Sequence, residues 1–186
     1  MEAGLKLVQL YAERVFFHAI PHASTKPAET GSKVDEATTT RNELVYKTTY
    51  DIGTFGQYIT IKFDGMMISV GAAKVFGLRA AYVKGDEEGP AVSLDLDEIR
   101  GMIEALQQIK SALPATTVGP GEYTKAKYSS RSGAEVGFYK TSAGEQKCYF
   151  QIDSMRSMVF FDAAKIDDLI TILQNGINKL TALGAK

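Results

Sequence analysis

The chain has 186 residues with a formal net charge of −1, and 45% of them are hydrophobic, including nine Phe and nine Tyr. This composition suits a sizeable core and argues against general disorder. Cys148 is the single cysteine, so neither a disulfide within the chain nor a Cys-rich zinc site is expected, and a reducing, intracellular compartment is favoured. No apolar run approaches the roughly 20 residues that span a bilayer, so we expect no membrane insertion. We also expect no metal and no cofactor.

Residues 1–43 are predicted to form an N-terminal segment that is distinct from the rest of the chain. Residues 4–20 mix helical and strand spacing, which leaves both alternatives open with a slight preference for a strand. Residues 21–43 are polar and poor in large apolar side chains, so they predict a flexible loop.

Residues 44–84 show the alternation of apolar and polar side chains that is typical of β-strands. The predicted strands cover residues 44–50, 57–63, 66–70 and 77–84. Asp64-Gly65 predicts a tight hairpin between the second and third of these strands, because Asp-Gly accepts the positive φ angles that such turns require. Residues 85–90 combine Gly, acidic residues and Pro, and they are predicted to form a turn.

A long amphipathic helix is predicted after this turn. Asp95 can cap it, and Glu98 three residues later completes a capping-box pattern. Apolar residues then recur at i, i+3, i+4 and i+7 spacing as far as Leu113, and Pro114 should stop the helix.

The same order of elements returns in the second half of the chain. Strands are predicted over residues 123–128, 134–141, 147–153 and 155–161. Asp162 can cap a second amphipathic helix, which Gly184 should end. The two helices align without gaps, and the identical pairs are Asp95/Asp162, Ile99/Ile166, Ile103/Ile170, Leu106/Leu173, Gln107/Gln174 and Leu113/Leu180. Convergence onto amphipathic helices could produce such pairs, but the shared order of four strands and a helix favours internal duplication.

The sequence therefore predicts an α+β fold of two ββββα units, each an antiparallel sheet followed by a long helix. The units cover residues 44–114 and 115–186, and both should belong to one compact domain. We expect each helix to cover one face of its own sheet. On the first sheet this covered face should include Tyr46, Ile61, Phe63 and Ile68.

Basic residues and tyrosines alternate on the predicted open faces of both sheets. Lys125 and Lys127 share a strand face, although either face is possible, and Arg131 lies in the adjoining loop. Lys and Arg can neutralise phosphate, and Tyr offers a flat surface on which an unstacked base can lie. Ordinary strand composition is the alternative interpretation, because Tyr favours strands and Lys guards exposed edges. The candidate nucleic-acid-binding residues are Lys47, Tyr58, Lys62, Arg79, Lys125, Lys127, Arg131, Tyr139, Lys147 and Tyr149. Tyr58, Tyr139 and Tyr149 are expected to stack on bases, and the basic residues to contact phosphates.

Three stretches stand out within roughly residues 42–183: Gly65-Met-Met-Ile68, Lys147-Cys-Tyr-Phe-Gln-Ile152 and Val45-Tyr-Lys47. They carry a resemblance to the Whirly family. Gly65-Met-Met-Ile68, leading through a strand to residues 92–99, is similar to the Whirly passage from its third strand into its first helix. Lys147-Cys-Tyr-Phe-Gln-Ile152, followed by Val159-Phe-Phe161 and the final helix, is similar to the second unit. Val45-Tyr-Lys47 lies where Whirly proteins place the strand that begins their basic signature.

The resemblance extends to two related groups, the single-stranded-DNA-binding coactivator positive cofactor four and the kinetoplastid guide-RNA-binding proteins of Whirly architecture. It implies sequence-tolerant binding of single strands that run along the sheet edges. It also implies a homo-oligomer, specifically a tetramer.

The leading hypothesis is a non-enzymatic protein that binds single-stranded DNA or RNA, with no choice possible between the two. The alternative is a protein-interaction or assembly subunit, for example of a virion or a larger complex, that uses the same sheets for oligomerisation. No enzyme is predicted, because the chain has no Walker A loop, no dinucleotide-binding glycine fingerprint and no His-Glu-x-x-His helix.

Overall fold

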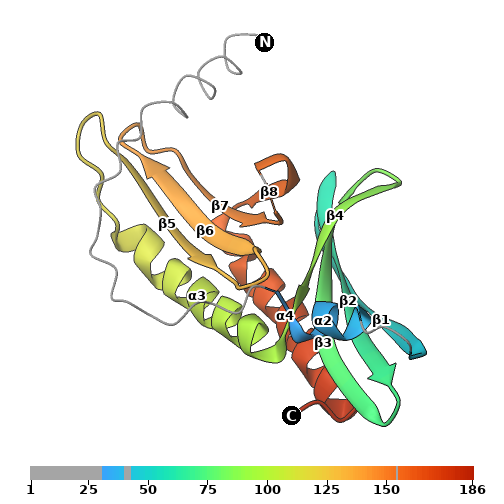
Figure 1. The fold of residues 1–186 in the computed structure, drawn as a ribbon. Coiled ribbons are helices and arrows are strands. Elements are labelled where there is room, and N and C mark those ends of the chain that lie inside the picture. Colours follow the sequence, from blue (N-terminus) through green and yellow to red (C-terminus); the bar gives the residue numbers. More distant parts are fainter. Residues whose placement is uncertain (1–30, 40–42, 154) are drawn as a thin grey trace.

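The computed structural model describes residues 31–39, 43–153 and 155–186. Over these residues the chain forms two four-stranded antiparallel sheets, ordered β1-β2-β3-β4 and β5-β6-β7-β8, and a long helix follows each sheet (Figure 1). The predicted α+β fold of two ββββα units is therefore confirmed. The open alternatives for residues 4–20 lie outside the described residues.

The elements of the first unit are β1 (Val45–Gly56), β2 (Ile59–Val70), β3 (Ala73–Lys84), β4 (Glu87–Leu94) and α3 (Leu96–Ala115). Those of the second are β5 (Tyr123–Ser129), β6 (Glu135–Thr141), β7 (Gln146–Gln151), β8 (Met158–Phe161) and α4 (Ile166–Ala182). Short 3₁₀ turns, η1 (Met155–Ser157) and η2 (Ala163–Lys165), flank β8. Asp95 and Glu98 form the predicted capping box of α3, and Pro114 lies in its last turn. Asp162 precedes η2 rather than α4 itself, and Gly184 follows α4 with a positive φ of 105°.

The predicted hairpin at Asp64-Gly65 is wrong, because both residues lie inside β2. They pair with β1 on one side and with β3 on the other, and Gly65 has no positive φ angle. The turns with positive φ angles are instead at Gly71, between β2 and β3, with φ of 57°, and at Gly85, between β3 and β4, with φ of 61°. The ladder on both sides of β2 overrides the local turn preference of Asp-Gly. Residues 87–94, expected to begin as a turn, form β4.

An uninterrupted β2 changes which side chains share a face. Successive residues of a strand point to opposite faces, so Phe63 and Ile68 cannot lie together as predicted. Phe63 enters the main core, whereas Ile68 packs in a separate cluster on the other face. Tyr46 shares the inner face of the sheet by register but remains exposed.

Each long helix packs mainly against the sheet of the other unit, which corrects the expectation that it would cover its own. Helix α4 crosses the first sheet, where Gly176 faces Leu78 of β3 and the Lys179 ammonium lies 4.9 Å from the Tyr50 ring of β1. Helix α3 lies along the second sheet (Figure 1), where Gly101 faces the Tyr128 ring of β5. The exchange ties the two units into one structure.

A single hydrophobic cluster runs through both units and contains residues of both sheets and both long helices. The inner faces of the sheets meet edge to face at two aromatic pairs, Phe63–Phe150 with centroids 5.8 Å apart and Phe55–Phe161 at 4.9 Å. Since the inner faces share this core, the outer faces of the two sheets point away from each other.

The predicted flexible loop over residues 21–43 is wrong for helix α2 (Lys33–Thr38). Ser32 caps this helix, and its buried Val34 packs on Met66 and Ile68 over the outer face of the first sheet. The backbone N–H of Lys33 donates to both carboxylate oxygens of Asp95 at 3.1 Å, which fixes α2 to the start of α3. Residues 21–30 and 40–42 lie outside the described residues.

Among the described residues, no helix combines the length and apolar character that a membrane span requires.

Candidate nucleic-acid interface

The register of the second sheet brings five of the candidate residues onto one outer face. Lys125, Tyr139 and Lys147 lie side by side on β5, β6 and β7. Two residues further along the strands, Lys127, Gly137, Tyr149 and Phe160 lie side by side on β5 to β8. The core-facing residues Val136, Phe138, Cys148 and Phe150 take the alternate positions. Strand periodicity predicted that Tyr139, Lys147 and Tyr149 point away from the core, but it left the face of Lys125 and Lys127 open, and the register places these two lysines beside them.

Three aromatic side chains form a continuous row on this face. The rings of Tyr123 and Tyr139 stack with centroids 5.9 Å apart and planes at 24°, and Tyr139 meets Phe160 edge to face at 6.1 Å. Tyr123 and Phe160 are 50% and 55% exposed, so part of the row is open to a ligand.

Sequence reasoning missed two members of the row. Tyr123 lies two residues before Lys125 on the same strand, so the alternation that selected Lys125 could have found it. Phe160 stands within the apolar run Met158–Phe161, which shows no alternation and therefore gave no signal.

Tyr149 does not stack on bases in this arrangement, contrary to the expectation. It is only 1% exposed, because its side chain lies across Gly137 and the Lys125 ammonium sits 4.9 Å from its ring centroid. The Tyr149 and Phe160 rings also meet in an edge-to-face arrangement, with centroids 6.5 Å apart.

The lysines of this face are largely paired with carboxylates. Lys127 bonds Glu135, and Lys147 bonds Asp162 at 2.6 Å. The hydrogen bond to Asp162 raises the pKa of Lys147. Burial by itself would raise the pKa of Glu135, but hydrogen bonds from Lys127 and Ser129 lower it. Among the described residues, Lys125 has no carboxylate within ion-pair distance.

The hydroxyl of Tyr139, the central ring of the aromatic row, also has a carboxylate partner. Tyr139 donates to Glu145 at 3.0 Å, and burial together with this hydrogen bond raises the pKa of Tyr139 to about 12. The face is therefore aromatic and close to electrically neutral, rather than strongly basic.

The basic candidates of the first sheet form a separate surface that carboxylates neutralise. Lys62 and Arg79 both contact Asp64, at 3.2 and 3.6 Å, and Arg79 also bonds Glu88. The hydrogen bond from Arg79 lowers the pKa of Glu88. Because Asp64 was assigned to a turn, its place beside Lys62 on the same strand face escaped prediction.

The remaining first-sheet candidates do not join the aromatic row. Lys47 shares the outer face of Lys62 by register, and the structure gives it no ion pair with a described residue. Tyr58 lies in the turn between β1 and β2 and is 90% exposed. The outer faces of the sheets point in different directions, so the ten candidates do not form one surface.

Arg131 serves the fold rather than an open ligand face. From the loop between β5 and β6 it donates to Asp97 at 2.6 Å and to Asp95 at 3.2 Å, and it lies 3.8 Å from Glu98. Its hydrogen bond lowers the pKa of Asp97. Ser132 reinforces the same junction by donating its backbone N–H to Glu98 at 3.0 Å. The expected phosphate contact of Arg131 is therefore replaced by three carboxylates at the start of α3.

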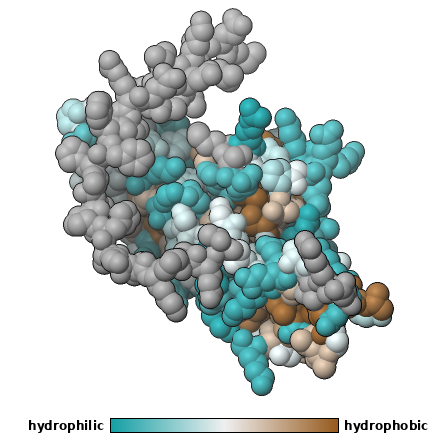
Figure 2. All heavy atoms as spheres, viewed as in Figure 1, coloured by the Kyte–Doolittle hydropathy of each residue, from teal (hydrophilic) through white to brown (hydrophobic). Residues whose placement is uncertain are grey.

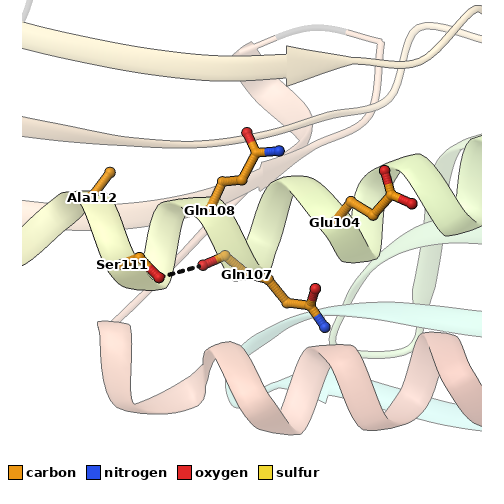
Figure 3. A pocket seen from close by; sticks show the side chains of 5 residues that line it. All are labelled: Glu104, Gln107, Gln108, Ser111 and Ala112. Carbon is orange, nitrogen blue, oxygen red and sulfur yellow. Dashed lines mark hydrogen bonds between the residues drawn. The ribbon is translucent and has the colours of Figure 1, made fainter.

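An open depression of about 630 Å³ lies along α3 and is lined by Glu104, Gln107, Gln108, Ser111 and Ala112 (Figure 3). Ser111 donates to the backbone carbonyl of Gln107 at 3.2 Å, and the two glutamines leave the helix in different directions. Its lining offers no nucleophile paired with a base. Within the described ranges, no three His, Cys, Asp or Glu side chains are grouped to hold a metal ion.

Comparisons of the chain with models of protein families, with curated proteins and with solved structures found no match.

Proposed function

We propose that the outer face of the second sheet binds single-stranded DNA or RNA with little sequence preference. The observation that carries the proposal is the row Tyr123–Tyr139–Phe160, partly exposed and flanked by Lys125. Any base can stack on such a row, because every base has a π face. The resemblance to single-strand-binding Whirly proteins supports the same ligand.

Stacking, rather than charge, supplies most of the affinity in this proposal. Each stacked base contributes about 1–3 kcal/mol. Lys125 can contact phosphate directly, whereas Lys127 and Lys147 must first leave Glu135 and Asp162. With one to three phosphate contacts, log affinity should fall with log salt at a slope of roughly −0.7 to −2. A strongly basic face would give a much steeper slope.

The test is a titration of a fluorescent single-stranded oligonucleotide with wild-type protein and with Tyr123→Ala and Phe160→Ala. Each substitution should weaken binding roughly 5- to 150-fold, which corresponds to about 1–3 kcal/mol. Tyr58→Ala is the matched control, because Tyr58 is exposed but isolated from the row, and it should bind as wild type. Absence of wild-type binding at low salt would refute the proposal.

A second candidate function, self-assembly through the first sheet, is supported by its edge strand. β1 is a 12-residue edge strand, and two large side chains are exposed there, Leu44 just before it and Tyr46 near its start. Hydrophobic side chains also gather at the lower right of Figure 2, over the end of the first sheet. Light scattering with and without oligonucleotide separates the functions: a stable oligomer that ignores oligonucleotide would favour assembly.

A further inference from the structure

The hydroxyl of Tyr149 is buried on the candidate binding face without a hydrogen-bond partner. Tyr149 is 1% exposed, and its Oη is one of two buried side-chain polar atoms without a partner among the described residues. The hydroxyl reaches across the second sheet to Gly137, where an added Cβ would lie only 2.5 Å from it. Gly137 therefore leaves the space that the Tyr149 side chain occupies.

Such a hydroxyl is costly in the free protein. Buried polar groups are nearly always hydrogen-bonded, and an unpartnered one loses its hydration without compensation. Phenylalanine would fill the same space without this cost. Burial raises the pKa of Tyr149, with smaller contributions from Glu135 and Tyr123, so the hydroxyl keeps its proton and remains a donor. The Tyr149 hydroxyl is thus a donor without an acceptor on the face that carries the proposed binding row, which suggests that the ligand itself supplies the acceptor.

We propose that the Tyr149 hydroxyl donates a hydrogen bond to a phosphate oxygen of the bound strand once the Lys125 side chain has moved off the Tyr149 ring. This inference rests on the proposed function. Lys125 is exposed and holds its ammonium 4.9 Å from the Tyr149 ring centroid. A phosphate attracts this ammonium away from the ring and into a direct ion pair. The same phosphate then lies beside the uncovered tyrosine.

The charges around Tyr149 favour a phosphate over a neutral group. Lys125 has no carboxylate within ion-pair distance among the described residues, so it can pair with an incoming anion. Glu135 is the nearby negative group, and it is already bonded by Lys127 and by Ser129 at 2.8 Å. These bonds reduce the repulsion between Glu135 and a phosphate. The exposed ammonium of Lys125 then makes the electrostatic potential beside Tyr149 positive.

The substitution Tyr149→Phe separates this role from simple packing. Removing the unpartnered hydroxyl should raise the melting temperature by a few degrees. The same change should weaken oligonucleotide binding about tenfold, because a hydrogen bond to a charged acceptor is lost. Tyr58→Phe is the matched control, since Tyr58 is exposed and lies outside the aromatic row, and it should leave both binding and melting temperature almost unchanged.

A peptide nucleic acid of the same base sequence, which keeps the bases but has no phosphates, identifies the acceptor. If Tyr149 contacts phosphate, the binding difference between wild type and Tyr149→Phe seen on DNA disappears on the peptide nucleic acid, whereas an equal loss on both strands overturns the phosphate assignment. Equal binding by wild type and Tyr149→Phe overturns the inference but leaves the proposed function standing. If wild type binds no oligonucleotide, the proposed function itself fails.

Discussion

Replacing Arg131 with alanine tests whether this residue belongs to the fold or to a ligand site. Arg131 is the cation that faces the buried carboxylates of Asp95 and Glu98 at the start of α3, and it also bonds the exposed Asp97. Removing the cation from a fully buried pair costs about 3–5 kcal/mol. The Arg131 side chain is 34% exposed, so solvent reduces the expected loss to about 2–3 kcal/mol. The melting temperature should fall by roughly 4–12 °C.

Thermal unfolding followed by circular dichroism measures this loss, with Lys110→Ala as the control. Lys110 bonds Asp167 at 2.7 Å between two exposed side chains, so its removal should change stability by at most about 1 kcal/mol. Oligonucleotide affinity of folded Arg131→Ala should match wild type. An unchanged melting temperature, or weakened binding at unchanged stability, would refute the structural role.

The same variant has a predicted pH dependence. Arg131 lowers the pKa of Asp97 below its ordinary 3.8, so their pairing stabilises the fold above that value. This contribution is lost as pH falls through the lowered pKa of Asp97. The stability gap between wild type and Arg131→Ala should therefore be constant above about pH 5 and narrow below about pH 4. A gap that widens on acidification would contradict the assignment.

Three further predictions address the packing. Leu180 of α4 is fully buried beside Gly65, so Leu180→Ala should lower the free energy of unfolding by about 2–5 kcal/mol. Hydrogen-exchange protection should fall more in β2 than in β6, and a larger loss in β6 would contradict the packing of α4 on the first sheet. Gly137→Ala should destabilise the protein by about 1–3 kcal/mol in urea unfolding, because its Cβ would collide with the backbone carbonyl of Ala126 and with the Tyr149 hydroxyl, and wild-type stability would contradict this packing. Burial raises the pKa of Cys148 to about 11, so its alkylation at pH 8 should follow the unfolding rate, and rapid labelling of native protein would show the thiol to be accessible.

Local patterns predicted the elements of the second unit and both long helices. The capping pair Asp95 and Glu98 and the i, i+3, i+4 spacing are local signals, and the structure keeps them. Alternation also placed Tyr139, Lys147 and Tyr149 on one face, because strands β6 and β7 contain no bulge that would shift their register, whereas the face of Lys125 and Lys127 followed only from the pairing of β5 with β6.

The first unit was harder because its strands are longer than local turn signals suggested. Asp64-Gly65 has turn chemistry but lies between two partner strands, and only the ladder across β1 to β3 reveals this. The error propagated to function, since it hid the contact of Asp64 with Lys62 and Arg79. Those cations looked available in the sequence but are neutralised in the fold.

Non-local packing was beyond reach of the sequence pattern. An amphipathic helix shows that it needs an apolar partner but not which sheet provides it. The contacts of Gly176 with Leu78 and of Gly101 with Tyr128 join elements from different units. The burial of Tyr149 likewise depends on the empty space at Gly137 across the strand pair, which residue type alone did not indicate.

Photo-crosslinking of a 4-thiothymidine-containing single strand to wild-type protein, with the modified residues mapped by mass spectrometry, tests the central claim most directly. The account predicts crosslinks at Tyr123, Tyr139 or Phe160 on the outer face of the second sheet. Crosslinks concentrated at Tyr58 or Lys47 of the first sheet would contradict it.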